Sequence, residues 1–250
     1  MKRVYGWHAD LPSHVPWFKY ERLLAAPLPA KTNNRPAIKW VYDQGEEGSC
    51  TANSGIGAER FFRATHGLPD FLGSRQFLYY ATRSLEGGTG SDSGASIADT
   101  ETAECKFGVC LESTWPYSKK LTVKPSAAAY KEALLHQVLV KSPLEQTQLA
   151  LETCIAAGQP VHYGMTVYES FESDAVAASG VVPMPKKREA ALGGHALYLF
   201  DYDRTKKLFY GQNSWGSGWG QAGLCLFSIP FNYILSPDYA SDFWTVSKVE

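Results

Sequence analysis

The 250-residue chain lacks an excess of charge of either sign and any long apolar run. Its 24 basic and 25 acidic side chains leave a formal net charge of -1, so nothing attracts it to a polyanion and we expect no nucleic-acid partner. No run of about 18 apolar residues occurs, and "MKRVYGWHADLPSHVPWFKY" at the N-terminus lacks the apolar core of a signal peptide. We therefore expect no membrane span. The protein is expected to be cytoplasmic, or exported by a route that its sequence does not reveal.

Cysteine is also scarce, which argues against a disulfide scaffold. The five cysteines make an odd count, which fits a reducing compartment or a catalytic thiol better than a set of disulfides; they are at positions 50, 105, 110, 154 and 225. Cys105 and Cys110 have a loose ligand-like spacing, but no second Cys/His pair accompanies them. We therefore predict no metal site and no cofactor.

The composition, with 44% hydrophobic and 20% charged residues, is that of an ordinary globular protein. Helical patterns dominate the first half, at 50–66, 74–88, 95–108, 125–137 and 144–158. Strand patterns dominate the second half, at 160–168, 194–203, 207–215, 223–229 and 242–249. This segregation predicts an α+β fold of two lobes, one helical and one of strands, and 250 residues suffice for two lobes that share a cleft.

The first 36 residues differ in composition from the rest of the sequence. They are rich in proline and aromatic residues and have no sustained period of either kind, which predicts an extended N-terminal segment before a domain at 37–250. Leaving its aromatic side chains in water would be costly, so they must pack somewhere; they are Tyr5, Trp7, Trp17, Phe18 and Tyr20. Two hypotheses stay open: the segment braces the outer face of one lobe, or part of it covers the cleft as a lid.

Three positions far apart in the sequence suggest one catalytic site. Cys50 stands at the start of a predicted helix, where unpaired amides and the helix dipole favour thiolate. His195 follows two glycines at the head of a predicted strand, and Asn213 ends the next strand. Each alone would be an ordinary structural residue, but together they form a Cys, His, Asn set in that chain order.

The segments around these residues resemble those of papain-like cysteine peptidases. "DQGEEGSC" is similar to the family's cysteine block, "GGHAL" to its histidine block and "NSWGSGWG" to its asparagine block. "GSCTANS", "YGWHADLP" and "FGVCLESTWPY" further resemble the bacterial and archaeal branch. The resemblance implies the papain-like two-lobe fold, with the active-site cleft between a helical lobe and a lobe of antiparallel strands. It also implies endopeptidase activity on peptide or protein substrates.

The resemblance also assigns a role to each matching residue. Cys50 would be the nucleophile, and His195 would take its proton to form an ion pair and later protonate the leaving amine. Asn213 would orient the imidazole, and Trp215 would shield that hydrogen bond from water. Gln44 would donate to the oxyanion together with the backbone N–H of Cys50.

The chain departs from the secreted members of the family at two positions. Glu47 stands where those members have a cysteine, and Thr51 where they have an aromatic residue. The first change removes a family disulfide, and the second alters the packing beside the nucleophile. We also keep two other functions open: a thiol acyltransferase, in which an amine resolves the thioester, and a catalytically silent homologue that binds peptides.

Candidates for substrate contacts also come from the resemblance. Gly94, in "DSGAS", falls where the family pairs a strand with the substrate backbone, and Gly164 and Ala196 fall on the walls of the main specificity pocket. Small residues there would suit a bulky apolar substrate side chain. Strand packing or turn formation is the alternative for each. We expect a monomer.

Overall fold

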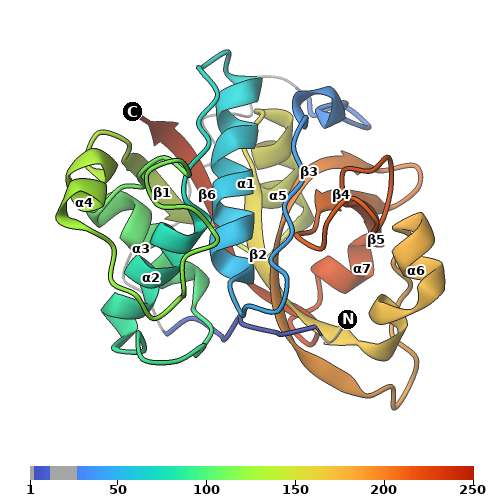
Figure 1. Ribbon diagram of the computed structural model, residues 1–250. Helices are drawn as coiled ribbons and strands as arrows, with labels where there is room; N and C mark the ends of the chain where they lie inside the picture. The colour runs from blue at the N-terminus through green and yellow to red at the C-terminus, as the bar shows by residue number, and fades with distance from the viewer. Residues whose placement is uncertain (1–2, 12–26) are drawn as a thin grey trace.

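The computed structural model describes residues 3–11 and 27–250, with a helical lobe and a β lobe on either side of a central helix (Figure 1). The helices are α1 (Cys50–Thr65), α2 (Arg75–Glu86), α3 (Ile97–Lys106), α4 (Ala127–Ala133), α5 (Gln148–Ala156), α6 (Asp174–Ser179) and α7 (Phe231–Ile234), with short 3-10 turns η2 (Arg35–Ala37) and η3 (Glu169–Glu172). The strands are β1 (Val138–Pro143), β2 (Val161–Tyr168), β3 (Ala191–Asp203), β4 (Leu208–Gln212), β5 (Leu226–Pro230) and β6 (Ala240–Val249). The predicted α+β class is confirmed.

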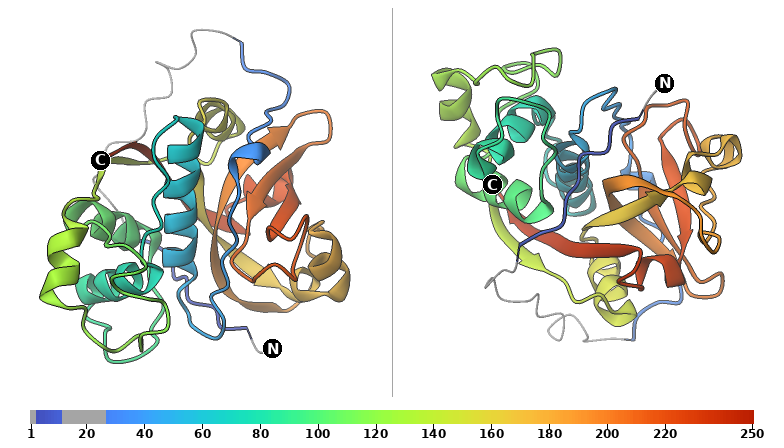
Figure 2. Two further views of the ribbon diagram at one scale, coloured as in Figure 1. Left: turned by 45° about the horizontal axis from the view of Figure 1, so that its top comes forward. Right: turned by 90° about the horizontal axis from the view of Figure 1, so that it is seen from below.

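The strands form one antiparallel sheet in the order β1-β6-β2-β3-β4-β5. The last strand of the chain, β6, therefore lies between β1 and β2, and the right view of Figure 2, seen from below, shows it running across the underside of the molecule. In the β2–β3 pair, Gly164 lies opposite Ala196 and Met165 opposite His195. This register brings two of the predicted pocket residues together at the predicted catalytic histidine.

Two apolar cores hold the lobes, and α1 lies where they meet. The helical lobe packs residues of α1, α2 and α3 with Tyr198 and Phe200 of β3, whereas the β lobe packs the other face of the sheet. Helix α1 can approach β3 closely because Gly57 has no side chain: a Cβ there would lie 2.7 Å from the Tyr198 ring. The chain beside the nucleophile is thus fixed against the strand that carries His195.

The predicted helices are present, with ends set by capping residues. Ser74 accepts a hydrogen bond from the N–H of Phe77, and Gly87 ends α2 in the left-handed conformation. The predicted start of α5 at residue 144 was wrong, because Thr147 caps the helix and it begins at Gln148. Likewise α4 begins after its cap, Ser126, and is shorter than the predicted 125–137.

Strand β1 was missed in the sequence. Its burial pattern lacks the alternation typical of a half-buried strand, because it pairs only with β6 at the edge of the sheet. The described helices include none that is both long and apolar enough to cross a bilayer.

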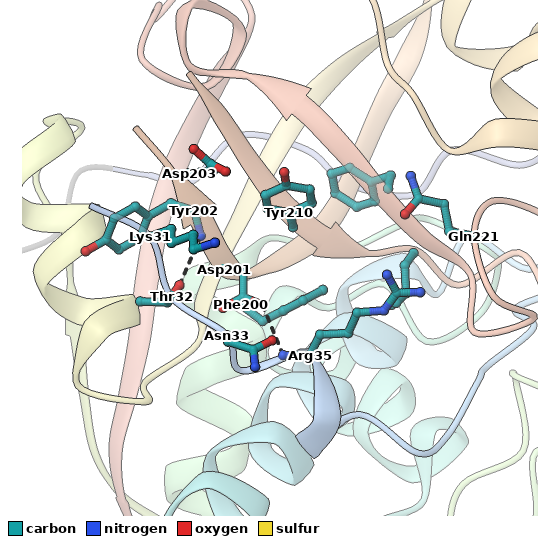
Figure 3. A pocket seen from close by; sticks show the side chains of 12 residues that line it. Lys31, Thr32, Asn33, Arg35, Phe200, Asp201, Tyr202, Asp203, Tyr210 and Gln221 are labelled. Atoms are coloured by element: carbon teal, nitrogen blue, oxygen red, sulfur yellow. Dashed lines mark hydrogen bonds between the residues drawn. The ribbon is translucent and has the colours of Figure 1, made fainter. Parts of the chain in front are cut away.

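The described part of the N-terminal segment lies in two places. Residues 31–35 run along β3, where the N–H of Thr32 donates to the carbonyl of Tyr202 and the N–H of Tyr202 donates to the side-chain hydroxyl of Thr32. The carboxylate of Asp201 accepts from the N–H groups of Asn34 and Arg35. Figure 3 shows this contact, at a pocket of about 130 Å³ lined by both segments. This part braces the β lobe, whereas residues 3–11 reach the cleft. Trp17, Phe18 and Tyr20 lie outside the described residues.

Candidate active site

The predicted nucleophile begins α1. Cys50 is the first residue of the helix and is fully buried. Gln44 lies in the loop that leads into α1, where its N–H donates to the carbonyl of Ser214 at 2.9 Å. The Gln44 side-chain oxygen accepts from the Ser214 hydroxyl at 2.7 Å, which fixes the orientation of the amide. In this orientation Nε2 of Gln44 donates to the carbonyls of Glu47 and Val4. Ser214 was not singled out in the sequence, although it follows Asn213 directly.

His195 lies in β3, between two aromatic rings. Its Nε2 is 2.8 Å from Oδ1 of Asn213, and Trp215 stacks on it with 5.0 Å between ring centroids. Tyr5 approaches the imidazole edge-on from the N-terminal segment. The bond to Asn213 leaves Nδ1 as the ring nitrogen available to Cys50, and within the described residues Nδ1 has no hydrogen-bond partner. The structure therefore joins His195, Asn213 and Trp215, and it places Cys50 in one buried cluster with Ala196, the residue after His195.

The electrostatics of this covered site favour neutral side chains. Burial raises the pKa of the Cys50 thiol, against the smaller effect of nearby backbone amides, including those of Gly6 and Trp7. Burial also lowers the pKa of His195 to about 4, against the smaller effect of its bond to Asn213. A thiolate–imidazolium pair is thus disfavoured while the N-terminal segment excludes water from both groups.

The shifted His195 pKa predicts a pH-dependent stability. Between pH 6.5 and about 4 the unfolded chain protonates this imidazole while the folded chain leaves it neutral, so the free energy of unfolding falls as pH falls through that window. The loss at the lower end is about 3 kcal/mol. Urea unfolding at a series of pH values should show this slope in the wild type and a shallower one in His195→Gln. Parallel curves for the two proteins would contradict the shift.

Residues 4–10 run across the site and bond to both lobes. The carbonyl of Gly6 accepts from the N–H of Ala95 at 2.7 Å, and the N–H of Trp7 donates to Gly194 of β3 at 3.2 Å. The N–H of His8 donates to the carbonyl of Ala95 at 3.3 Å. Figure 2, on the right, shows this dark-blue stretch passing from one lobe to the other. The backbone of the segment is thus hydrogen-bonded to both lobes.

The side chain of Trp7 fills a pocket made possible by glycines. A Cβ on Gly164 would lie 2.0 Å from the indole, and one on Gly194 would lie 2.5 Å from it. The indole packs against a buried cluster that contains Cys50, Ile97, Ala196 and Trp244. Gly164 and Ala196, both predicted to line the specificity pocket, are therefore found around the Trp7 indole, and their contact with a substrate stays a prediction.

Gly94 also contacts the segment, although not as predicted in detail. A Cβ there would lie 2.1 Å from the carbonyl oxygen of Gly6, and its φ of +73° suits glycine. The backbone hydrogen bonds to the segment come from its neighbour Ala95, which the sequence analysis missed. Alanine beside an obvious glycine carries no chemical signal, so only the structure identifies it.

Asp10 anchors the far end of the segment. Its carboxylate accepts from the N–H of Ala98 at 2.8 Å and from the indole N–H of Trp244 at 2.7 Å, and its own N–H donates to Asp242 at 3.0 Å. Burial is the main cause that raises the pKa of Asp10 to about 6. Closer to the start of the segment, the hydroxyl of Tyr5 donates to Glu172. These contacts hold both ends of the segment against the cleft.

Comparisons with known proteins agree with this geometry. A family model described as papain family cysteine protease matches residues 28–232. An uncharacterized peptidase C1-like protein of Acanthamoeba polyphaga mimivirus is 37% identical over 217 residues, which is 83% of this chain and 69% of the relative.

Solved structures give the same picture. Xylellain, a cysteine protease from Xylella fastidiosa, is 34% identical and superimposes with a TM-score of 0.90, covering 98% of this chain and 96% of its own. A cysteine protease from Carica candamarcensis shares the fold at 19% identity, with a TM-score of 0.64 over 88% of this chain and 99% of its own.

Proposed function

Because this chain belongs to the papain family of cysteine proteases, we propose that it hydrolyses peptide bonds through a thioester on Cys50. His195 takes the thiol proton, and the thiolate attacks the peptide carbonyl. The oxyanion accepts from Nε2 of Gln44 and the N–H of Cys50. His195 then returns the proton to the departing amine, and water activated by the same imidazole hydrolyses the thioester.

One observation supports this arrangement above the others. The carbonyl oxygen of Val4 accepts from Nε2 of Gln44 at 3.3 Å, while Gly6 and Trp7 pass beside the thiol. The chain's own peptide backbone thus occupies the donor that an oxyanion needs. We include in the proposal that residues 4–8 hold the cleft closed, so that a substrate enters only after they leave.

The proposal takes one chain as sufficient. All five proposed catalytic or supporting side chains come from a single chain, and the formal charge of -1 offers no reason for a nucleic-acid partner. A monomer acting on peptides or unfolded proteins therefore satisfies the geometry.

Incubation with a denatured protein, followed by mass spectrometry of the products, tests the function. We expect new carboxyl termini that carry one atom of ¹⁸O when the reaction runs in labelled water. Products joined to an added amine, even at low amine concentration, would instead indicate acyl transfer. An intact protein that is retained on the enzyme would indicate binding without turnover.

The glycine-lined pocket predicts a preference that one methyl group should change. In Gly164→Ala, the added Cβ occupies the position of the indole. We compare two peptides, one with Trp and one with Ala at the residue that enters the pocket. The kcat/KM of the Trp peptide divided by that of the Ala peptide should fall at least about tenfold. Gly218→Ala is the matched control, because nothing lies within 4 Å of a Cβ built there. An unchanged ratio in a folded Gly164→Ala protein would show that substrates do not use this pocket.

A further inference from the structure

A second histidine lies beneath the active site, in a chain of buried hydrogen bonds that the proposed reaction does not use. His162 of β2 has Nε2 2.7 Å from the hydroxyl of Ser54 and Nδ1 3.0 Å from Oε1 of Glu101 in α3. Ser54 is one helical turn after Cys50, and its hydroxyl oxygen is 2.7 Å from the carbonyl oxygen of Cys50. The chain Glu101–His162–Ser54 therefore ends on the backbone of the nucleophile.

The hydrogen count in this chain gives it a direction. Ser54 has one hydroxyl hydrogen, and two oxygens 2.7 Å apart need that hydrogen between them, so it is donated to the carbonyl of Cys50. The hydroxyl oxygen can then meet Nε2 of His162 only as an acceptor, so Nε2 carries a hydrogen. One further proton lies between Nδ1 and Glu101. Each link is thus occupied by one hydrogen, and removing any member leaves a buried polar group unpaired.

The hydrogen-bond chain Glu101–His162–Ser54 also connects the two lobes. Ser54 and Glu101 belong to helices of the helical lobe, whereas His162 belongs to β2, which pairs with the strand that carries His195. The separation of the lobes at this level determines where Cys50 lies relative to His195. A directional bond between β2 and the first turn of α1 restrains that separation more closely than apolar contact does.

Burying these groups has an energetic cost that apolar side chains would avoid. His162, Glu101 and Ser54 are all nearly inaccessible, with exposed fractions of 1%, 1% and 4%. Other charged or titratable groups gather around them: Glu59 and Glu104 from the helical lobe, Arg63 and Lys141, and Asp10 from the N-terminal segment. Apolar side chains at all three positions would pack without this cost.

We propose that His162 is a positioning residue, which through Ser54 holds the first turn of α1 so that the Cys50 sulfur faces His195. This inference rests on the proposed function of Cys50 and His195. It predicts that the hydrogen-bond chain matters more for the reactivity of the Cys50 thiol than for substrate binding. Loss of these hydrogen bonds should therefore lower kcat and leave KM nearly unchanged.

The test uses the full chain carrying Trp7→Ala, which takes the indole out of the cleft. In this background we compare two variants that interrupt the hydrogen bonds, His162→Leu and Ser54→Ala, with His162→Gln, whose side-chain N–H can still donate to Ser54. Thr245→Val is the matched control, because it removes a buried hydrogen bond to the carbonyl of Pro160, beside β2. Within the described residues the Thr245 hydroxyl has no hydrogen bond to α1. For each protein we measure kcat, KM and the pH profile of Cys50 alkylation by iodoacetamide.

We expect His162→Leu and Ser54→Ala to lose about 10-fold to 100-fold in kcat. The midpoint of their alkylation profile should rise toward that of an ordinary cysteine, near about 8.5. His162→Gln and Thr245→Val should stay close to the parent. A changed closure of the cleft would scale the alkylation rate at every pH and leave its midpoint in place.

The proposal is overturned if the two disruptive variants keep the parent's midpoint and its kcat within about twofold. Should His162→Leu fail to fold, Ser54→Ala decides alone, since it removes a single oxygen. Alkylation needs no turnover, so a parent that cleaves no peptide would refute the proposed function while the midpoints still test the role of His162.

Discussion

A chain without residues 1–10 is expected to hydrolyse a small peptide substrate about 10-fold to 100-fold faster than the full chain. The reason is the partial burial of Trp7 in the cleft. Full burial of a large apolar side chain stabilises the closed form by about 1.5 to 3 kcal/mol, which sets the upper limit on the loss of the open fraction. The deletion stops before residues 31–35, which pack on β3, so the fold keeps its brace. Initial rates at several substrate concentrations, with urea unfolding of both proteins, provide the measurement.

The matched control weakens the brace and leaves the cleft covered. Thr32→Val removes the hydroxyl that accepts from the N–H of Tyr202 at 3.2 Å, and should lower the free energy of unfolding with no gain in rate. A truncated protein that stays folded and is no faster than the full chain would refute the lid.

Replacement of the nucleophile should have the largest effect of all. Cys50→Ala is expected to reduce hydrolysis below detection and to leave the fold intact, because the change removes only the attacking sulfur. Circular dichroism and urea unfolding check the fold, and the rate is measured in the chain that also lacks residues 1–10, where a residual rate would be easiest to see. Turnover in a pure Cys50→Ala preparation would refute the thioester mechanism.

The other catalytic side chains should rank below Cys50 in a fixed order. His195→Ala removes the base itself, whereas Asn213→Ala removes only the acceptor 2.8 Å from its Nε2, so the loss should be smaller for Asn213→Ala. Rates for the two folded variants, compared at the same pH, give the order. Equal losses would mean that Asn213 does more than orient the ring.

The sequence could predict the fold and the candidate site because both depend on local patterns. A capping serine and a left-handed glycine mark the ends of α2, and the blocks around residues 50, 195 and 213 carry the resemblance on which the family assignment rests. The structure places those three residues together, whereas their catalytic roles stay predictions.

Long-range contacts were beyond such patterns. Nothing local distinguishes a segment that covers a cleft from one that braces a lobe, and the described residues include both kinds, at 3–11 and at 31–35. Ala95 and Ser214 were missed for the same reason, since each acts through its place opposite a distant residue. The Glu101–His162–Ser54 chain joins two helices and a strand, and no spacing in the sequence reveals it.

The covering of Cys50 also has a consequence for oxidation. Peroxide attacks thiolates, and a buried, neutral thiol is a poor target for it. The five cysteines, all within the described residues, are free, so a reducing agent that preserves the nucleophile removes no crosslink from the fold. We therefore expect the Cys50 thiol to stay reduced while the N-terminal segment covers it. If residues 4–8 leave the cleft as proposed, we expect oxidation of Cys50 to become a risk only then.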